Sequence, residues 1–396
     1  MNKKGWQRTT LGAAFSTVTG NTPRKNNAHF YGQFMPLVKP PELCDAKLDT
    51  SEDGLSEDGA EVARTVPPNS ILVSCIGNLG KVGLNTVPVA FNQQINAILP
   101  DDGKAIPEFM FYQVLSSSFK EQLEALASGT TVPIVNKSKF NSIEIVLPPL
   151  PEQQRIVGIL DEAFAGIATA KANAEKNLQN ARALFESHLQ SVFTQRGPGW
   201  VEKRLDDVCT FSSGGTPSKS NSSYWSGKIP WISGRDMKST RLSDSLLHIS
   251  KSAVDESSTR MAAAGTLLIL VRGMGLAHGA QIAELIVPCA FNQDIRGIHA
   301  EPSLIPRYLL FALRDGINSS ATVLSNAAHG TLKIDSNELY SVMIPVPPRK
   351  CQQKIVETID ALVEETQRLA RLYERKLALL AALKKSLLHQ AFSGTL

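Results

Sequence analysis

The sequence predicts two α/β (α+β) domains in tandem, each followed by a long helix, with the two helices paired as an antiparallel coiled coil. Three observations predict this fold class. The two halves of the chain repeat the same landmarks, strand signals precede each helical run, and each run continues for about forty residues without Gly-Pro punctuation. The predicted boundaries are 1–150 and 197–349 for the domains, and 151–196 and 350–396 for the helices.

The internal repeat rests on residues that recur at a nearly constant offset. A Gly-Trp pair returns 194 positions later, a Phe-Asn-Gln motif 200 positions later, and a Pro-Pro pair 199 positions later. Because the order is kept while the offset drifts by only a few residues, the two halves are expected to share one fold. The matched residues are Gly5-Trp6 with Gly199-Trp200, Thr22-Pro23 with Thr216-Pro217, Asn92-Gln93 with Asn292-Gln293, and Pro148-Pro149 with Pro347-Pro348.

Three segments of the first domain have clear secondary-structure signals. The apolar run Ile71–Ile76 follows two prolines and predicts a buried strand. Residues 107–126 place large apolar side chains on one face and predict a helix. Residues 143–147 predict a closing strand, and Pro148-Pro149 ends it because proline cannot donate to a ladder.

An acidic stretch interrupts the first domain between Glu42 and Glu61. It is rich in Ser, Gly and Asp, a composition typical of a solvated surface loop. Phosphate groups would repel its carboxylates, so we expect it to point away from any nucleic acid.

Each helical run carries an apolar stripe at heptad spacing. Helices of about forty residues, each about 60 Å long, need a partner for such stripes, and the nearest partner is the other helix. The Gly197-Pro198-Gly199 break leads into a second domain, which favours an antiparallel pair. The stripes comprise Leu160, Ala163, Ile167, Ala170, Ala174, Ala181 and Leu184, and Ile359, Leu362, Leu369, Tyr373, Leu380, Leu383 and Leu387.

The second domain repeats the elements of the first. Gly265–Arg272 corresponds to the strand segment Asn69–Ile76, and residues 306–314 correspond to the helix that starts at Pro107. Residues 342–344 correspond to the closing strand. One domain fold is therefore expected to occur twice.

The bulk composition excludes several classes of protein. With 396 residues, of which 42% are hydrophobic, the chain can bury more than one core. A net charge of +4 permits a nucleic-acid partner without requiring one. The five cysteines form no C-x-x-C pattern, and the longest apolar run, Met261–Val271, is too short to span a bilayer. No signal-peptide core follows Lys3-Lys4, so we expect a cytoplasmic chain without a membrane partner.

Motifs for catalysis are missing. No Asn-Pro-Pro-aromatic element is present, and Gly80-Lys81 is followed by Val82, which excludes a P-loop. Gly273-Met274-Gly275 with Gly279 departs by one residue from a dinucleotide-binding loop. The seven histidines are scattered and have no metal-binding spacing. We therefore expect no catalytic site, no metal and no cofactor in this chain.

A Pro-Glu-Gln-Gln motif leads into the first long helix, and the second copy keeps the prolines and Gln352-Gln353. Further motifs are Trp200, Leu205, Gly214-Gly215-Thr216-Pro217-Ser218, Tyr224-Trp225, Gly227-Lys228-Ile229-Pro230-Trp231-Ile232 and Gln390-Ala391-Phe392-Ser393-Gly394. At these residues the chain resembles the DNA specificity (S) subunit of type I restriction-modification systems, over nearly its whole length. The second copy departs with Arg349-Lys350-Cys351 in place of Leu150-Pro151-Glu152, and the first keeps only Tyr31-Gly32 of the aromatic stretch.

The resemblance implies a non-catalytic subunit of a methyltransferase and endonuclease complex. Each domain would be a target recognition domain that reads one half of a bipartite, asymmetric site in double-stranded DNA, and the helices would set the gap between the halves. Two methyltransferase (M) subunits would dock on the spacer helices, residues 152–193 and 352–392. They would supply S-adenosylmethionine chemistry, and restriction (R) subunits would add translocation and cleavage driven by ATP and Mg.

Candidate DNA contacts lie in loops next to matched positions, where planar and amide side chains could read base edges. We match the loop that carries Thr130, Thr131 and Lys137 with the loop that carries His329, Thr331 and Lys333. A solvated surface role remains open for each candidate, and Asn92-Gln93 and Asn292-Gln293 are either structural amides or base readers. The candidates are Arg24, Lys25, Lys81, Thr130, Thr131, Lys137, Lys219, Arg235, Arg272, His329, Thr331 and Lys333.

Two other functions remain open at this point. The chain could be a coiled-coil scaffold whose two heads bind proteins, or an enzyme with an unrecognised active site. Selection from random duplexes would separate the scaffold from a DNA reader. Turnover by the chain alone would identify an enzyme.

Overall fold

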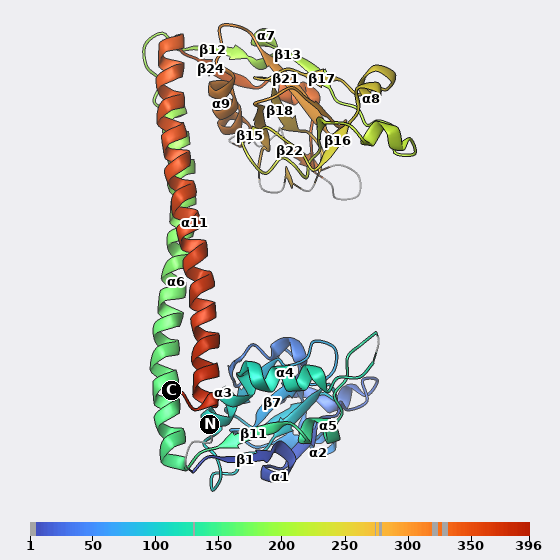
Figure 1. The fold of residues 1–396 in the computed structure, drawn as a ribbon, viewed down its shortest axis with the longest axis vertical. Helices are drawn as coiled ribbons and strands as arrows, with labels where there is room; N and C mark the ends of the chain where they lie inside the picture. The colour runs from blue at the N-terminus through green and yellow to red at the C-terminus, as the bar shows by residue number, and fades with distance from the viewer. Residues whose placement is uncertain (1–4, 130, 274, 277–278, 319–323, 327–331) are drawn as a thin grey trace. The chain divides into compact units, whose positions relative to one another are not determined.

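The computed structural model describes residues 5–129, 131–273, 275–276, 279–318, 324–326 and 332–396 (Figure 1). Its contacts divide the chain into two compact units. Unit 1 comprises Met1–Lys176 and Tyr373–Leu396, and unit 2 comprises Asn177–Leu372. Two long helices, α6 (Leu150–Thr194) and α11 (Arg349–Ser393), each contribute one half to each unit.

The domain of unit 1 combines a five-stranded sheet, a four-stranded sheet and a strand pair. The five-stranded order is β2 (Thr17–Thr19), β10 (Ile95–Ile98), β7 (Ile71–Ser74), β8 (Val82–Asn85) and β4 (Ala46–Leu48). The four-stranded order is β5 (Gly54–Leu55), β3 (Tyr31–Val38), β9 (Val89–Phe91) and β6 (Thr65–Val66). Strand β1 (Gln7–Thr10) pairs with the predicted closing strand, β11 (Glu144–Leu147).

The domain of unit 2 has the same three sheets in the same order, as the repeat predicts. Its five strands are β13 (Cys209–Ser213), β21 (Ile295–Ala300), β18 (Leu267–Leu270), β19 (Ile282–Leu285) and β15 (Arg241–Leu242). Its four strands are β16 (Leu247–Ile249), β14 (Ile229–Ile232), β20 (Cys289–Phe291) and β17 (Met261–Ala262). The strand pairs are β12 (Val201–Arg204) with β24 (Met343–Val346), and β22 (Leu324–Asn326) with β23 (Leu332–Ile334).

The shorter helices also correspond between the units. Unit 1 contains α1 (Leu11–Ala14), α2 (Glu57–Val62), α3 (Pro107–Leu115), α4 (Ser117–Ala125), α5 (Lys137–Asn141) and two 3-10 turns, η1 (Ala28–Phe30) and η2 (Pro40–Glu42). Unit 2 contains α7 (Leu205–Val208), α8 (Lys251–Glu256), α9 (Pro306–Asn318), α10 (Ser336–Tyr340) and η3 (Ser222–Trp225). The predicted fold class, two tandem mixed α/β domains each followed by a long helix, is confirmed.

The core of unit 1 explains why β7 is buried at every position. Ile71 and Val73 face α3 together with Phe109, whereas Leu72 faces Phe91 and the four-stranded sheet. All four residues of β7 are buried because the strand lies between two layers. The predicted strand at residues 71–76 is therefore a central strand.

The helix predicted at residues 107–126 is interrupted. It forms α3 and α4, which are separated by Ser116 in extended backbone with φ −67° and ψ 150°. The Ser116 hydroxyl donates to the Gln113 carbonyl at 2.6 Å and accepts from the Phe119 N–H at 3.3 Å. Serine competes for backbone groups in this way, which ends one helix and caps the next.

A buried glutamine joins each domain to the long helix that follows it. Gln153 is fully buried, accepts from the Ile106 N–H at 2.9 Å, and donates to the carbonyls of Lys104 and Pro148 at 3.0 and 2.8 Å. Gln352 makes the same bonds to the Ile305 N–H and to the carbonyls of Ser303 and Pro347. The glutamine of the matched motif therefore fixes the start of the helix against the loop before α3 or α9.

Eight residues further along each helix, a matched aspartate makes a second joint. In unit 2 Asp360 binds the Arg307 guanidinium at 2.8 and 2.9 Å and Arg241 at 3.0 Å. The Arg307 side chain is only 7% exposed, so Asp360 neutralises a buried cation. In unit 1 the matched Asp161 is exposed and accepts from the Tyr112 hydroxyl instead.

Within each unit the two helix halves run antiparallel. In unit 1 Ile156 and Leu160 of α6 share a cluster with Leu388 and Ala391 of α11. In unit 2 Phe185, Leu189 and Phe193 share a cluster with Ile359. Two of the predicted stripe residues are not packed, however, because Leu184 is 61% exposed and Leu383 is 48% exposed.

Residues 42–61 are predicted to form a solvated surface loop, but part of this segment forms regular structure. The segment contains β4, β5 and the start of α2, and it buries Leu43 and Leu55. Acidic side chains occupy its exposed positions, and apolar ones anchor it to the two sheets.

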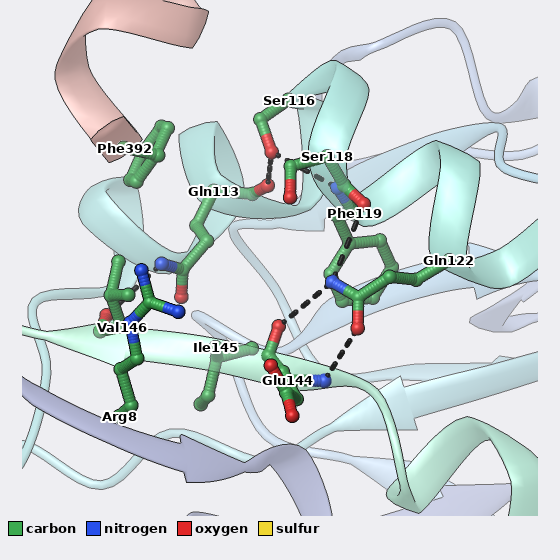
Figure 2. A pocket seen from close by; sticks show the side chains of 10 residues that line it. All are labelled: Arg8, Gln113, Ser116, Ser118, Phe119, Gln122, Glu144, Ile145, Val146 and Phe392. Carbon is green, nitrogen blue, oxygen red and sulfur yellow. Dashed lines mark hydrogen bonds between the residues drawn. The ribbon is translucent and has the colours of Figure 1, made fainter.

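Figure 2 shows a small pocket of about 110 Å³ beside the end of α11 in unit 1. Phe392 forms one wall, and the Gln113 amide donates to the Val146 carbonyl at 3.0 Å. At the matched place in unit 2, the Tyr308 hydroxyl donates to the Pro345 carbonyl at 2.6 Å. The matched carbonyl oxygens of Val146 and Pro345 therefore accept from different side chains in the two units.

No helix in the described parts of the chain is both long enough and apolar enough to cross a membrane.

Candidate nucleic-acid interface

In both units three turns meet at one end of the five-stranded sheet, which we name the turn end. In unit 2 Leu270 pairs with Ile295, and Ser213 pairs with Arg296, both in antiparallel register. The residues after Ser213 and Leu270 therefore meet the residues that precede Ile295. Unit 1 repeats this register, with Ser74 opposite Ile95 and Thr19 opposite Asn96.

Two matched glycines allow these turns to touch. A Cβ atom on Gly20 would lie 2.3 Å from the carbonyl oxygens of both Phe91 and Asn92. A Cβ atom on Gly214 would meet the matched oxygens of unit 2 at 2.2 and 2.3 Å. Only glycine permits this approach of backbone to backbone.

Side chains of the Thr-Pro turn and the Asn-Gln turn complete the contact. The Thr22 hydroxyl donates to the side-chain Oε1 of Gln93 at 3.0 Å, and the Thr216 hydroxyl donates to the side-chain Oε1 of Gln293. Asn92 is 8% exposed and is bonded to Gln94, so its amide is structural. Gln93 is exposed, and its NH₂ group has no partner among the described residues.

Two predicted cations lie side by side at the turn end of unit 2. Arg272 forms an isolated antiparallel bridge with Lys333, so the two side chains share one face. Arg272 is exposed and Lys333 is half-buried, and neither forms an ion pair with any described residue. Like charges directly opposite each other repel. A bound anion would relieve this repulsion.

The matched bridge of unit 1 is apolar. Ile76 pairs with Ile134 in the same antiparallel way. Within the two matched loops Lys137 is not the counterpart of Lys333, because Lys137 begins α5 and corresponds to Ser336, the first residue of α10.

The other candidates differ in how firmly the structure places them. Lys81 is half-buried at the start of β8, where its carbonyl accepts from the Ser74 N–H at 2.9 Å. A Cβ atom added to Gly234 would lie 3.2 Å from the Leu270 side chain, so Gly234 lies beside the end of β18. Arg235 is the next residue in the chain. The exposed candidates are Arg24, Lys25, Thr131, Lys137, Lys219 and Arg235. Thr130, His329 and Thr331 lie outside the described residues.

An open groove lies beside the Thr-Pro turn of unit 1. The groove holds about 580 Å³, has Phe30 and Val62 among its apolar walls, and is lined by Arg24 and Asn26. In unit 2 the residues that match Phe30 and Val62 are Tyr224 and Glu256, and the Tyr224 hydroxyl donates to the Glu256 carboxylate at 3.0 Å. The heads therefore present different surfaces on one frame.

Sequence reasoning missed Asn26 and Arg296 as candidates. Arg296 lies in β21 beside Ser213, where unit 1 has the Asn96–Thr19 pair with its 2.6 Å hydrogen bond. The Nε atom of Arg296 is buried without a partner among the described residues. An arginine within a strand of apolar residues was the signal that could have identified it.

The described residues supply little for catalysis. Burial raises the pKa of the Cys75 and Cys209 thiols to about 12, and that of Cys289 to about 11, so these thiols stay protonated. Burial also lowers the pKa of His299, which lies 2.8 Å from the Ser212 hydroxyl. Among the described residues no group of three or more His, Cys, Asp or Glu side chains could hold a metal ion.

Two tandem domains share one frame, and each is followed by a long helix. At both turn ends some polar groups have no partner among the described residues, an arrangement that suits a recognition protein with two heads. A family model described as "Type I restriction modification DNA specificity domain" matches residues 3–179 and again residues 198–374. The chain belongs to this family.

Two curated relatives are specificity subunits. The chain is 31% identical over 268 residues to the type I restriction enzyme EcoR124I/EcoR124II specificity subunit of Escherichia coli, which covers 66% of this chain. It is 34% identical over 170 residues, 41% of this chain, to the HindI specificity subunit of Haemophilus influenzae. The matches span 64% and 37% of the relatives' own lengths.

Two solved structures share the fold. One comes from a study of complex assembly and conformational transition of the type I R-M system, with a TM-score of 0.83 at 22% identity. It covers 100% of this chain and 99% of that chain. The HsdS subunit from Thermoanaerobacter tengcongensis has a TM-score of 0.60 at 20% identity, over 99% and 98% of the two chains.

Proposed function

We propose that this chain is the sequence-specific DNA-binding subunit of a type I restriction-modification complex. The observation that carries the proposal is the Arg272–Lys333 pair, two adjacent cations without an acidic partner among the described residues. DNA supplies what the pair lacks, since phosphates bind cations and the guanine edge accepts a bidentate arginine. The description of the family, a DNA specificity domain, also indicates DNA as the ligand.

Each unit would read one half of a bipartite, asymmetric site. The support is the matched frame with unmatched side chains, namely Arg272 and Lys333 in unit 2 against Ile76 and Ile134 in unit 1. A shared frame with different side chains suits two different half-sites on one duplex. The long helices would act as spacers that set the gap between the halves.

Partner subunits would perform the chemistry. We place two M subunits on the spacer helices, where Leu184, Leu372, Leu379 and Leu383 are 48–61% exposed. Exposed leucines in such numbers favour protein contacts. S-adenosylmethionine would bind to the M subunits, and ATP and Mg would act in the R subunits, while this chain would form no bonds in the substrate.

A protein-binding scaffold is the weaker alternative. It would use the exposed leucines equally well, but it gives no role to the paired cations of the turn end. The two curated relatives described above are specificity subunits, which also favours the DNA reader.

Co-expression with an M subunit, followed by genome-wide mapping of methylated adenines, tests the proposal. The expected result is one split motif with a fixed gap, whose half-sites are centred about one helical turn apart, ~10 base pairs, so that both lie on one face of the duplex. A contiguous motif, or no methylation by a stable complex, would contradict the two-headed reader.

The same map tests the spacer. Inserting one heptad into both α6 and α11 is expected to change the gap while keeping both half-site sequences. An unchanged gap would assign the spacing to another part of the complex.

Removing Lys333 is expected to weaken DNA binding at all sites, because a phosphate contact carries no sequence information. In the assembled complex, Lys333→Ala should reduce the slope of log affinity against log salt by about one. Affinity measured by fluorescence anisotropy between low and moderate salt gives this slope. Lys203→Ala is the matched control, since Lys203 is exposed on β12, which pairs with β24 and not with the five-stranded sheet. An equal change in both variants would exclude a specific role for Lys333.

A further inference from the structure

The two turn ends share a set of backbone hydrogen bonds that fixes one loop against another. In unit 1 the Val135 N–H donates to the Cys75 carbonyl at 2.8 Å, and the Gly77 N–H donates to the Pro133 carbonyl at 2.9 Å. In unit 2 the Ile334 N–H donates to Val271 at 2.9 Å, and the Gly273 N–H donates to Leu332 at 3.2 Å. Ile76 and Ile134 therefore occupy the places of Arg272 and Lys333.

The unit 1 loop is a tight hairpin that presents apolar side chains to solvent. Ser128 and Ile134 exchange two backbone hydrogen bonds of 3.0 and 2.8 Å, and Gly129 turns the chain with φ +103°. Ile134 is 40% exposed and Val132 is 46% exposed. Ser128 and Thr131, both exposed and polar, belong to the same loop, so the exposed valine and isoleucine are not part of a core.

If the turn end faces DNA, the exposed Val132 and Ile134 side chains can contact one kind of apolar group. In the major groove the only large apolar group is the C5-methyl of thymine, which side-chain carbon atoms contact. Lys137, exposed at the start of α5, follows the hairpin in the chain and can hold the adjacent backbone. A cationic pair at the same place, as in unit 2, would instead attract phosphate or guanine.

We propose that Ile134, supported by Ile76, determines specificity in unit 1 by packing against the methyl group of a thymine in its half-site. This proposal rests on the proposed function, because it places the turn end on DNA. The proposal assigns recognition of a thymine methyl group to unit 1, whereas the matched residues of unit 2, Arg272 and Lys333, are cations. The two half-sites are therefore recognised by different chemical groups.

Thymine-to-deoxyuridine substitution tests the contact, because it removes the methyl group and leaves the base pair intact. Each thymine of the unit 1 half-site is replaced in turn, and binding by the assembled complex is measured. We expect one position at which the substitution weakens binding about fourfold, the effect of losing one buried methyl group. Ile134→Ala should weaken binding to thymine DNA by a similar factor and should no longer distinguish deoxyuridine from thymine.

Two further variants sharpen the test. Ile134→Lys copies unit 2 and should lose methyl sensitivity while making binding more salt-dependent. Ile286→Ala is the control, since Ile286 is 45% exposed and follows β19 at the end of its sheet opposite the turn end. It should keep the full deoxyuridine effect.

The outcomes separate the two proposals. If the wild-type complex gives no split methylation motif, the proposed function fails before any substitution is made. If the split motif is present, the inference is overturned by a unit 1 half-site without thymine, by insensitivity to deoxyuridine at every position, or by an Ile134→Ala variant that remains sensitive.

Discussion

Asp360→Ala is expected to destabilise unit 2 by about 3 kcal/mol, because it leaves the buried guanidinium of Arg307 without its closest counter-ion. Arg307 donates twice to Asp360 and once to the Thr240 carbonyl, at 3.1 Å. Only the last bond would remain. Burial raises the pKa of nearby Glu284, and Arg307 and Arg241 partly oppose that rise, so Glu284 can replace only part of the lost charge.

Hydrogen–deuterium exchange of the full chain measures this loss unit by unit. Peptides from α9 and β19 should exchange faster in Asp360→Ala, whereas peptides from β7 and β10 should not change. The matched control is Asp161→Ala, which removes a bond to the neutral Tyr112 hydroxyl at an exposed position. Asp161→Ala is expected to lower the free energy of unfolding by about 1 kcal/mol. An equal loss in Asp360→Ala would contradict the claim that Asp360 stabilises unit 2 by neutralising the buried Arg307.

Gly20→Ala is expected to destabilise unit 1 by about 3 kcal/mol or more, since the new Cβ would meet two carbonyl oxygens at 2.3 Å and neither can move alone. The turn end would open, and the unit 1 half-site should disappear from the methylation motif while the unit 2 half-site persists. Chemical denaturation followed by exchange in β2 and β10 reports the loss of stability.

Gly166→Ala is the control, and it is expected to stabilise the protein where Gly20→Ala destabilises it. Gly166 lies within α6, and a Cβ added there meets nothing within 4 Å. Alanine should raise the free energy of unfolding by about 0.5–1 kcal/mol through helix propensity. A Gly20→Ala variant as stable as Gly166→Ala would exclude the tight crossing of the turns.

The repeat allowed much of this architecture to be predicted from the sequence. The repeat predicts that Gly265–Arg272 corresponds to Asn69–Ile76, and these segments contain β18 and β7, the central strands of two sheets with one strand order. The Gln153 and Gln352 motifs marked the starts of both helices. These signals are local, so propensity and proline positions sufficed to locate them.

Register along the helices and contacts across the sheets were harder to predict. A strict heptad drifts by about 20° per repeat on a straight α-helix, so the packed stripe moves from Ala181 to Phe185 and leaves Leu184 exposed. Ser116 broke a helix through one side-chain hydrogen bond that periodicity does not detect. The bridge between Arg272 and Lys333 joins residues far apart in the chain, and only the folded sheet brings them together.

Unit 1 is built from two separate stretches of the chain, and this has a consequence for its folding during synthesis on the ribosome. Its domain is translated first, yet its core includes Leu388, Ala391 and Phe392, near the end of the sequence. Unit 2 has all of its parts once Leu372 has been made. Unit 1 therefore cannot complete its core until α11 has been made, and part of its apolar surface stays exposed until then. Unit 2 can complete its core earlier. A frameshift or nonsense codon in the last turns of α11 would therefore damage the head that is encoded more than two hundred codons upstream.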